Sequence, residues 1–419
     1  MEKKTHFIRT LSFFDTLMLG LGFVIGAGIF IMPMLMAQQS GTFSLIAWAA
    51  AGVYCILTSL SFAECAARMP IAGGPYAYAH KVFGNASGFL CGYTLWTSYW
   101  ITIAAELWAI AWYLRFFLPY GELPRLGIAC GIGLLLTYTN YRGVRKGSEM
   151  QDALTVVKLL ALILFIAVGL SFLQPERLQL VQGDGELLPG FLASLLLALW
   201  AYQGAEIITI PEEEIKSPRK NVPKALIICV LAVMALYLLV SVVVLGSVEW
   251  REFATSETPI ADMMASFVGG WGGVALALGG LIAIIGAMNA VTLGAARLTY
   301  AMARDGLFPR FFDYLSPRYE TPSRALWLHF AMASCLALLV NNFATLAMLV
   351  VAFILIPHAI SAFVALRGKC RFAPRWIHYV VAALSLALAA YALSQSLLPA
   401  FILMVAGALL YELVIRRKI

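Results

Sequence analysis

Five ionisable side chains lie inside long apolar stretches of the sequence: Glu106, Lys158, Glu206, Arg297 and His358. A charge at the centre of a lipid bilayer costs at least about 2.5 to 3.5 kcal/mol, so such residues normally face a cavity, a partner or a transport path. We favour a functional role for Glu106, Lys158 and Glu206, because each lies well inside its stretch. A buried pair of Lys158 with a carboxylate that serves only packing is the alternative.

The other two residues have simpler explanations. Arg297 lies about two turns before the end of its stretch, where a long side chain can reach the interface or pair inside a bundle. His358 follows Pro357 and can satisfy backbone groups that the proline leaves free. The sequence therefore leaves the roles of Arg297 and His358 open.

Residues for covalent or metal chemistry are scattered in this sequence. Five histidines and seven cysteines form no CxxC motif, no Cys/His cluster and no pairing of a nucleophile with a base. We therefore predict no catalytic residue, no metal ligand, no cofactor and no enzymatic activity. A channel is the other class of protein to consider, but a channel would give the intramembrane charges no function.

The elements that must position these charges are membrane helices. Of the 419 residues, 62% are hydrophobic and 12% are charged, against about 45 to 50% and 25% in soluble domains. We expect an all-α integral membrane protein with about 12 transmembrane helices in a single domain over residues 1–419. The predicted spans are 12–37, 42–69, 86–118, 125–141, 150–173, 187–210, 223–248, 272–303, 324–341, 343–366, 376–394 and 396–415.

Lysine and arginine gather in alternate loops of this topology. The opposite loops hold only Arg125, Arg177 and Arg251. By the positive-inside rule both termini are cytoplasmic, and the bilayer is the inner (plasma) membrane of the cell. The net charge of +7 then follows from membrane topology and calls for no nucleic-acid partner.

Glycines interrupt the first and the sixth of these spans. The first carries VIGAGIF, from Val24 to Phe30, and the sixth carries WAYQGAE, with Gly204 near its middle. Glycine inside a helix costs about 0.8 to 1.0 kcal/mol relative to alanine. The alternative use of Gly22 and Gly26 is close helix packing.

Two interrupted helices five apart fit two inverted five-helix repeats that bind substrate at the breaks. The repeats would cover 12–173 and 187–366, with helices 11 and 12 at 376–415. An unwound helix exposes N–H groups at the start of one half-helix and carbonyl groups at the end of the other. The N–H groups can bind a carboxylate and the carbonyl groups can bind an ammonium.

Four motifs then occur in order. They are GAGIF from Gly26, GGPYAYAHKVFG from Gly73, WAYQGAE with EEEIKSPRKNVPKA after it, and RLTYAMARDGLFP from Arg297. Together they resemble the amino acid/polyamine/organocation transporter superfamily along nearly the whole chain. The resemblance implies a leucine-transporter-type fold and secondary amino acid transport by alternating access.

The resemblance also implies roles for individual residues. Backbone amides of Gly26, Ala27 and Gly28 would hold the substrate carboxylate. Carbonyls of Val24 or Ile25, with Trp200 and Gln203 beside Gly204, would bind its ammonium. The gating and coupling residues would be Trp200, Tyr202, Glu206 and Lys158. Lys158 would stand where sodium-coupled relatives bind a cation, so we predict sodium-independent transport that is proton-coupled or an exchange.

Fewer residues of the sequence bear on the choice of substrate. FILIPHAI and DGLFP resemble the basic amino acid/polyamine antiporter branch, and Glu106 could pair with a cationic side chain. Ile103 and Val291 stand where the arginine/agmatine antiporter has an asparagine and a tryptophan. A cationic amino acid or polyamine is therefore the first expectation and a neutral amino acid the alternative. Direction of transport and oligomeric state stay open.

Overall fold

The computed structural model describes residues 10–143, 147–184 and 186–414, with the backbone alone for 147–152. The basic residues at both chain ends, on which part of the topology prediction rests, lie outside these ranges. Every regular element in the described ranges is helical, apart from an isolated bridge between Leu11 and Ile215. The predicted all-α class is confirmed.

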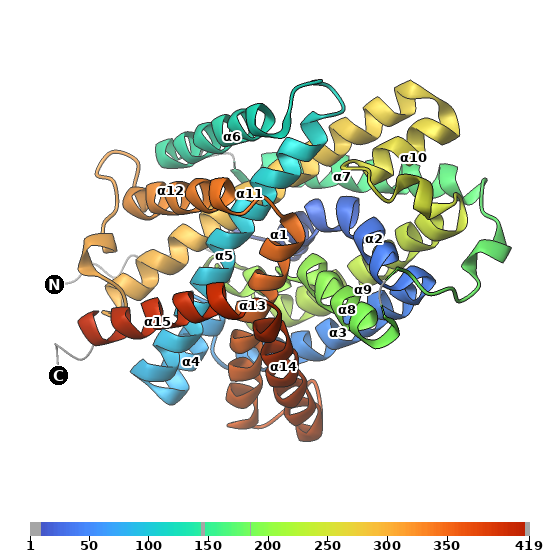
Figure 1. Ribbon diagram of the computed structural model, residues 1–419. Coiled ribbons are helices and arrows are strands. Elements are labelled where there is room, and N and C mark those ends of the chain that lie inside the picture. The colour runs from blue at the N-terminus through green and yellow to red at the C-terminus, as the bar shows by residue number, and fades with distance from the viewer. Residues whose placement is uncertain (1–9, 144–146, 185, 415–419) are drawn as a thin grey trace.

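Fifteen α-helices follow one another along the described chain (Figure 1). Their bounds are α1 Phe13–Val24, α2 Ala27–Ser40, α3 Ser44–Arg68, α4 Pro75–Phe83, α5 Asn85–Leu114, α6 Glu122–Arg142, α7 Gly147–Leu170, α8 Leu187–Tyr202, α9 Pro218–Gly246, α10 Pro259–Val268, α11 Gly270–Arg304, α12 Ser323–Leu339, α13 Phe343–Leu366, α14 Arg375–Gln395 and α15 Leu397–Val414. Six short 3-10 helices join them: η1 Gly41–Phe43, η2 Pro175–Leu178, η3 Ala205–Thr209, η4 Glu212–Glu214, η5 Trp250–Phe253 and η6 Arg310–Phe312.

Each of the twelve predicted ranges contains a helix. Within the described ranges, eight helical stretches are long and apolar enough to cross a membrane by length and composition. They are Ala27–Arg68, Ala153–Leu170, Leu187–Thr209, Pro218–Gly246, Gly270–Arg304, Phe343–Leu366, Arg375–Gln395 and Leu397–Val414. The count of twelve spans and the inverted repeats stay predictions.

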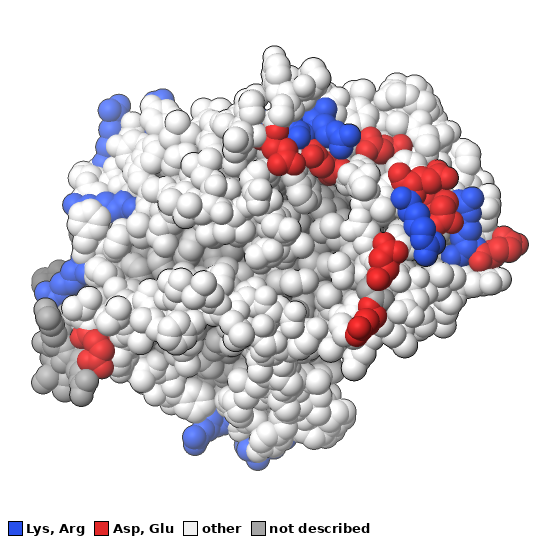
Figure 2. Space-filling model, in the orientation of Figure 1, with Lys and Arg blue, Asp and Glu red and all other residues white. Residues whose placement is uncertain are grey.

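Helix α5 runs through the middle of the bundle (Figure 1). It packs against α4, α6, α11, α12 and α13, while α8 packs against α2 and α3. Most of α5 is buried, including Glu106. Charged side chains on the face in Figure 2 form small groups at its rim and leave a broad uncharged middle. An uncharged surface of this kind suits contact with lipid.

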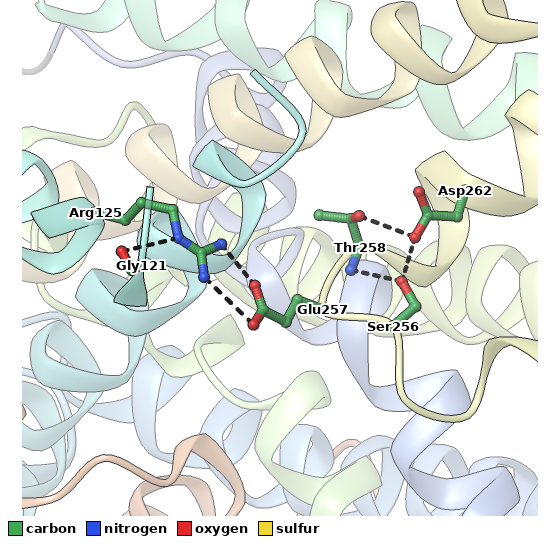
Figure 3. A network of polar contacts seen from close by, with 6 residues as sticks. All are labelled: Gly121, Arg125, Ser256, Glu257, Thr258 and Asp262. Atoms are coloured by element: carbon green, nitrogen blue, oxygen red, sulfur yellow. Dashed lines mark hydrogen bonds and ion pairs between the residues drawn. The ribbon is translucent and has the colours of Figure 1, made fainter. Parts of the chain in front are cut away.

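An ion pair joins the first turn of α6 to the loop before α10. The guanidinium of Arg125 contacts both carboxylate oxygens of Glu257, at 2.7 and 3.4 Å (Figure 3). Beside it, Thr258 and Ser256 bond to Asp262 in the first turn of α10. Because only 5% of the Arg125 side chain is exposed, this two-pronged contact is shielded from solvent.

Candidate functional site

The first helix break lies at Ile25 and Gly26, between α1 and α2. In a continuous helix the N–H of Gly26 would donate to the carbonyl of Gly22. Here it donates to the carbonyl of Val24 at 3.0 Å, so the carbonyl of Gly22 loses its helical partner. The break predicted from the glycines is therefore present at this position.

The glycines of the first break also allow close packing. A Cβ on Gly26 would lie 2.7 Å from the Cβ of Ala287 and 3.0 Å from Oε1 of Glu106. A Cβ on Gly28 would lie 2.7 Å from the Cβ of Ala201 in α8. Close approach is thus a second reason for glycine here, alongside the break itself.

Lys158 of α7 binds the carbonyl end of the first break. Its Nζ donates to the carbonyl oxygens of Gly22 at 2.5 Å and Ile25 at 2.8 Å. The side chain is fully buried. A cation is favourable at the C-terminal end of a helix, so Lys158 stabilises the end of α1.

Glu106 of α5 lies at the same break, against Gly26. Next to Gly26, α2 begins at Ala27, and the N-terminal end of a helix favours a negative charge. Oε2 of Glu106 is buried without a hydrogen-bond partner among the described residues. The two ends of this break are therefore met by side chains of opposite charge from two other helices.

The second break separates α8 from the 3-10 helix η3. Gly204 adopts a φ of 112°, a left-handed conformation that favours glycine. Its N–H donates to Oε2 of Glu206 at 2.9 Å, and Thr209 donates to the carbonyl of Glu206 at 2.6 Å. Oε1 of Glu206 is buried, and the described chain offers it no hydrogen bond. This break is stabilised within its own segment.

Tyr237 of α9 connects the two breaks. Its hydroxyl lies 2.9 Å from the carbonyl oxygen of Val24 and 3.3 Å from that of Ala201. The sequence analysis missed this residue, because a single tyrosine in an apolar stretch gives no signal of its partner. A tyrosine that links the breaks makes their positions interdependent.

The two aromatic residues predicted as gates occupy different surroundings. Trp200 meets Phe343 edge to face at 5.2 Å, and its ring lies 3.5 Å from a Cβ on Gly28. Tyr202 packs between Trp48 and Tyr237, whose ring centroids lie 5.6 and 5.2 Å away. Trp200 therefore borders the first break, whereas Tyr202 contacts α3 and α9.

The remaining predicted substrate residues lie at the end of α8 and within α5 and α11. Gln203 donates its amide to Thr102 of α5 at 3.3 Å, and its Oε1 is buried with no partner in the described ranges. Ile103 and Val291 are buried apolar side chains of α5 and α11. Buried polar atoms normally have partners, so the free oxygens of Glu106, Gln203 and Glu206 indicate a region that water or ligand completes.

Arg297 and His358 make contacts of their own. Arg297, with 52% of its side chain exposed, lies 3.8 Å from a carboxylate oxygen of Glu214. Nδ1 of His358 lies 3.1 Å from the hydroxyl of Tyr54, and its ring contacts Phe62 edge to face. Arg297 is thus an accessible ion-pair residue, and His358 joins α13 to α3.

Two segments that are far apart in the sequence meet just after the second break. We call this contact, formed by residues 71–78 on residues 209–215, the lower seal. The N–H of Gly73 donates to the carbonyl of Ile210 at 3.1 Å, and the hydroxyl of Tyr78 donates to Glu212 at 2.5 Å. Burial raises the pKa of Glu212 well above its ordinary 4.5. The sequence analysis used both motifs without predicting that they touch.

The comparisons with known proteins cover nearly the whole chain. A family model described as amino acid permease matches residues 11–412. The branched-chain amino acid permease BcaP of Bacillus subtilis is 28% identical over 79% of this chain and 75% of its own length. The methylthioribose transporter of B. subtilis is 30% identical over 81% and 77%. Human cationic amino acid transporter 4 is 27% identical over 81% of this chain and 56% of its own.

Proposed function

Since the chain belongs to the amino acid permease family, we propose that it is a secondary active amino acid transporter that binds substrate at the two helix breaks. Membership of this family supports an integral membrane transporter rather than an enzyme. Alternating access, the position of the site and the coupling ion are our proposals. The observation that carries them is the set of buried, unpartnered oxygens of Glu106, Gln203 and Glu206 at two broken helices.

The backbone of the first break would receive the substrate carboxylate. Gly26 caps α2, and Ala27 and Gly28 form its first turn, where helical N–H groups have no intrahelical acceptor. The N–H of Gly26 donates to the carbonyl of Val24 and that of Ala27 to Glu106, so the substrate carboxylate would have to replace these two acceptors. An anion is favourable at such an end. These features support the role that the family resemblance implies for the three residues.

The substrate ammonium would lie between the breaks. The carbonyls of Val24 and Ile25 already accept from Tyr237 and Lys158, respectively. A carbonyl oxygen has two lone pairs, so each can accept a second bond. We propose that Oε1 of Gln203 supplies a further acceptor, because it is buried and unpaired within the described chain.

Transport would be independent of sodium. The Nζ of Lys158 donates hydrogen bonds to two carbonyl oxygens of the first break. A metal cation at this position would contact the same two oxygens. In place of sodium, Glu206 would take part in coupling to protons, since one of its carboxylate oxygens has no hydrogen-bond partner in the described ranges. Uptake into proteoliposomes that requires sodium would contradict this proposal.

Two substrate classes fit the site for different reasons. The free Oε2 of Glu106 supports a cationic amino acid or polyamine, because a carboxylate can pair with a second ammonium. The opposite charges of Glu106 and Lys158 and the apolar Ile103 and Val291 support a neutral amino acid. We retain the cationic class as the first candidate and the neutral class as the second.

Exchange in proteoliposomes separates these candidates. One labelled amino acid would be competed with a panel of cationic, neutral and diamine ligands, at two pH values and with or without sodium. In Glu106→Gln, loss of competition by cationic ligands alone would support charge recognition. Equal loss for all ligands would give Glu106 a structural role, and a non-saturating flux would contradict a carrier.

The lower seal would face the cytoplasm in the plasma membrane. Lys81 in the last turn of α4 and Lys216 just before α9 lie beside the two segments of the seal, and the positive-inside rule places such basic residues inside. A closed lower seal beneath the breaks is what an outward-facing or occluded transporter needs. Labelling of cysteines introduced at either end in sealed cells would test this orientation.

A further inference from the structure

Three potential metal ligands meet where α3 ends and α14 begins. They are Glu64 of α3, Cys370 of the loop between α13 and α14, and His378 of α14. One ligand atom from each lies within 4.8 Å of the other two. They are far apart in the sequence, which explains why the sequence analysis predicted no metal ligand.

His378 has one ring nitrogen that is held by a hydrogen bond and one that has no partner among the described residues. Its Nδ1 lies 2.9 Å from the hydroxyl of Ser61, one turn before Glu64 on α3. Its Nε2 is buried and has no hydrogen bond to any described residue. Histidines that bind metals are commonly oriented in this way, by a hydrogen bond on the opposite nitrogen.

Glu64 is held by a comparable arrangement. Oε1 accepts from the backbone N–H groups of Arg371, Phe372 and Ala373, and so fixes the loop before α14. Oε2 is fully buried and lacks a partner in the part of the chain that is described. The carboxylate thus has one oxygen that orients it and one that is available.

Neighbouring groups do not supply the missing contacts. The guanidinium of Arg68 donates to the carbonyls of Glu64, Val364 and Ala365. The thiol of Cys370 has only weak contacts with carbonyl oxygens, at 3.8 and 3.9 Å. A buried polar atom without a partner is costly, and two residues of this cluster, Glu64 and His378, each carry one such atom.

We propose that Glu64, Cys370 and His378 bind a divalent transition metal ion of the zinc class, with water as the fourth ligand. Carboxylate oxygen, thiolate sulfur and imidazole nitrogen are all ligands that zinc accepts, at about 2.0 to 2.3 Å. Tetrahedral bonds of that length put ligand atoms about 3.3 to 3.8 Å apart. Small side-chain rotations are enough to reach this geometry from 4.8 Å.

The ion would fasten α3 to the loop that joins α13 and α14. The negative charges of a carboxylate and a thiolate balance a divalent cation, with Arg68 as an additional positive neighbour. Because the thiol must lose its proton on binding, affinity rises with pH. The inference concerns a structural site and does not depend on the substrate proposed above.

Cobalt binding to the purified full-length protein in detergent tests the proposal. Co²⁺ bound to a thiolate gives a charge-transfer absorption band, and Zn²⁺ should displace Co²⁺ and abolish that band. In Cys370→Ser the band should disappear and calorimetric Zn²⁺ affinity should fall at least about tenfold, on the scale of lost metal-site contacts. The matched control is Cys335→Ser, an exposed cysteine in α12, which should retain both.

A second variant distinguishes a ligand from a positioning residue. Ser61→Ala should keep the band and weaken Zn²⁺ binding by about tenfold, because Ser61 only orients His378. Absence of a band in the unmodified protein would overturn the proposal. A band and affinity that survive unchanged in Cys370→Ser would also overturn it, by assigning the ion to another place. Neither variant removes the contacts of Glu64 that fix the loop, so folding should be retained.

Discussion

The two helix breaks are stabilised in different ways. The first break, between α1 and α2, is completed by side chains from other helices: Lys158 from α7, Glu106 from α5 and Tyr237 from α9. The second has its shortest polar contacts within its own segment, where Glu206 accepts from Gly204 and Thr209 donates to the carbonyl of Glu206. Its contacts with other helices are longer, at 3.3 Å from Tyr237 to Ala201 and from Gln203 to Thr102. The first break therefore depends on how the bundle is assembled, whereas the second keeps its shape through local contacts.

This difference indicates that the two breaks would move to different extents during transport. A break that is fixed by three other helices can move only if those helices rearrange with it. The second break carries its own contacts, so it can shift as a unit on the lower seal once the two 3.3 Å contacts, of Tyr237 with Ala201 and of Gln203 with Thr102, are released. We infer that the first break is the fixed half of the binding site and the second is the mobile half.

The largest expected effect is that of Lys158→Met. The substitution leaves the carbonyls of Gly22 and Ile25 without their donor and the buried charge of Glu106 without an opposite charge. A buried carbonyl oxygen that loses its donor costs about 1 to 3 kcal/mol, and here two lose theirs. We expect a large fall in the temperature of unfolding in detergent and loss of exchange activity.

Two further variants make this result specific to the break. Lys216→Met, at an exposed lysine, should leave stability and exchange unchanged. Glu106→Gln combined with Lys158→Met should be less destabilised than the sum of the single changes, since both buried charges are gone. Full stability of Lys158→Met alone would show that the first break does not depend on α7.

Gly204→Ala should have the next largest effect. The φ of 112° strains any L side chain, and a Cβ added at this position would lie 2.0 Å from the ring of Phe23, so alanine is both strained and obstructed. Such a strained residue costs about 1 to 3 kcal/mol. We expect lower stability together with a fall in exchange, measured by thermal unfolding and substrate counterflow.

Gly127→Ala is the matched control for that substitution. Gly127 lies in α6 with no heavy atom within 4 Å of its Cβ position, so alanine should be neutral or slightly stabilising. If Gly204→Ala behaved like Gly127→Ala, the second break would not need its left-handed residue, and its local stabilisation would be in doubt.

Glu206→Gln should change coupling more than stability. The amide oxygen of glutamine can still accept from the N–H of Gly204, so the local contact that defines the second break survives. The side chain can no longer exchange a proton. We expect the pH dependence of net uptake to flatten, with exchange between two substrate pools retained. An unchanged pH profile would remove Glu206 from proton coupling.

The sequence predicted the elements better than their contacts. Long apolar runs located helices in all twelve ranges, and the glycines located both breaks, because span length and helix propensity are local properties. The acceptors of Lys158, the link through Tyr237 and the meeting of Glu64 with His378 join residues that are far apart in the chain. Such contacts depend on how helices pack, which composition and spacing do not determine.

The smallest expected effect lies at the lower seal, on which the mobile half would move. Burial raises the pKa of Glu212, so its carboxyl group binds a proton more tightly when the seal is closed than when the seal is open and hydrated. Protonation of Glu212 therefore stabilises the closed seal. Closure is therefore fully favoured below about pH 4.5 and weakens as the pH rises towards the raised pKa. Hydrogen exchange of residues 71–78, corrected for the intrinsic pH dependence, should show more opening at higher pH.

Two variants separate the titration from the contact itself. Glu212→Gln should abolish the pH dependence, whereas Tyr78→Phe should weaken the seal by about 1 kcal/mol, the worth of one hydrogen bond. In Tyr78→Phe the carboxyl still titrates, so opening should still increase with pH. A slope that persists in Glu212→Gln would assign the titration to another group. If the seal also failed to respond to Tyr78→Phe, movement of the second break would have to be governed by its local contacts alone.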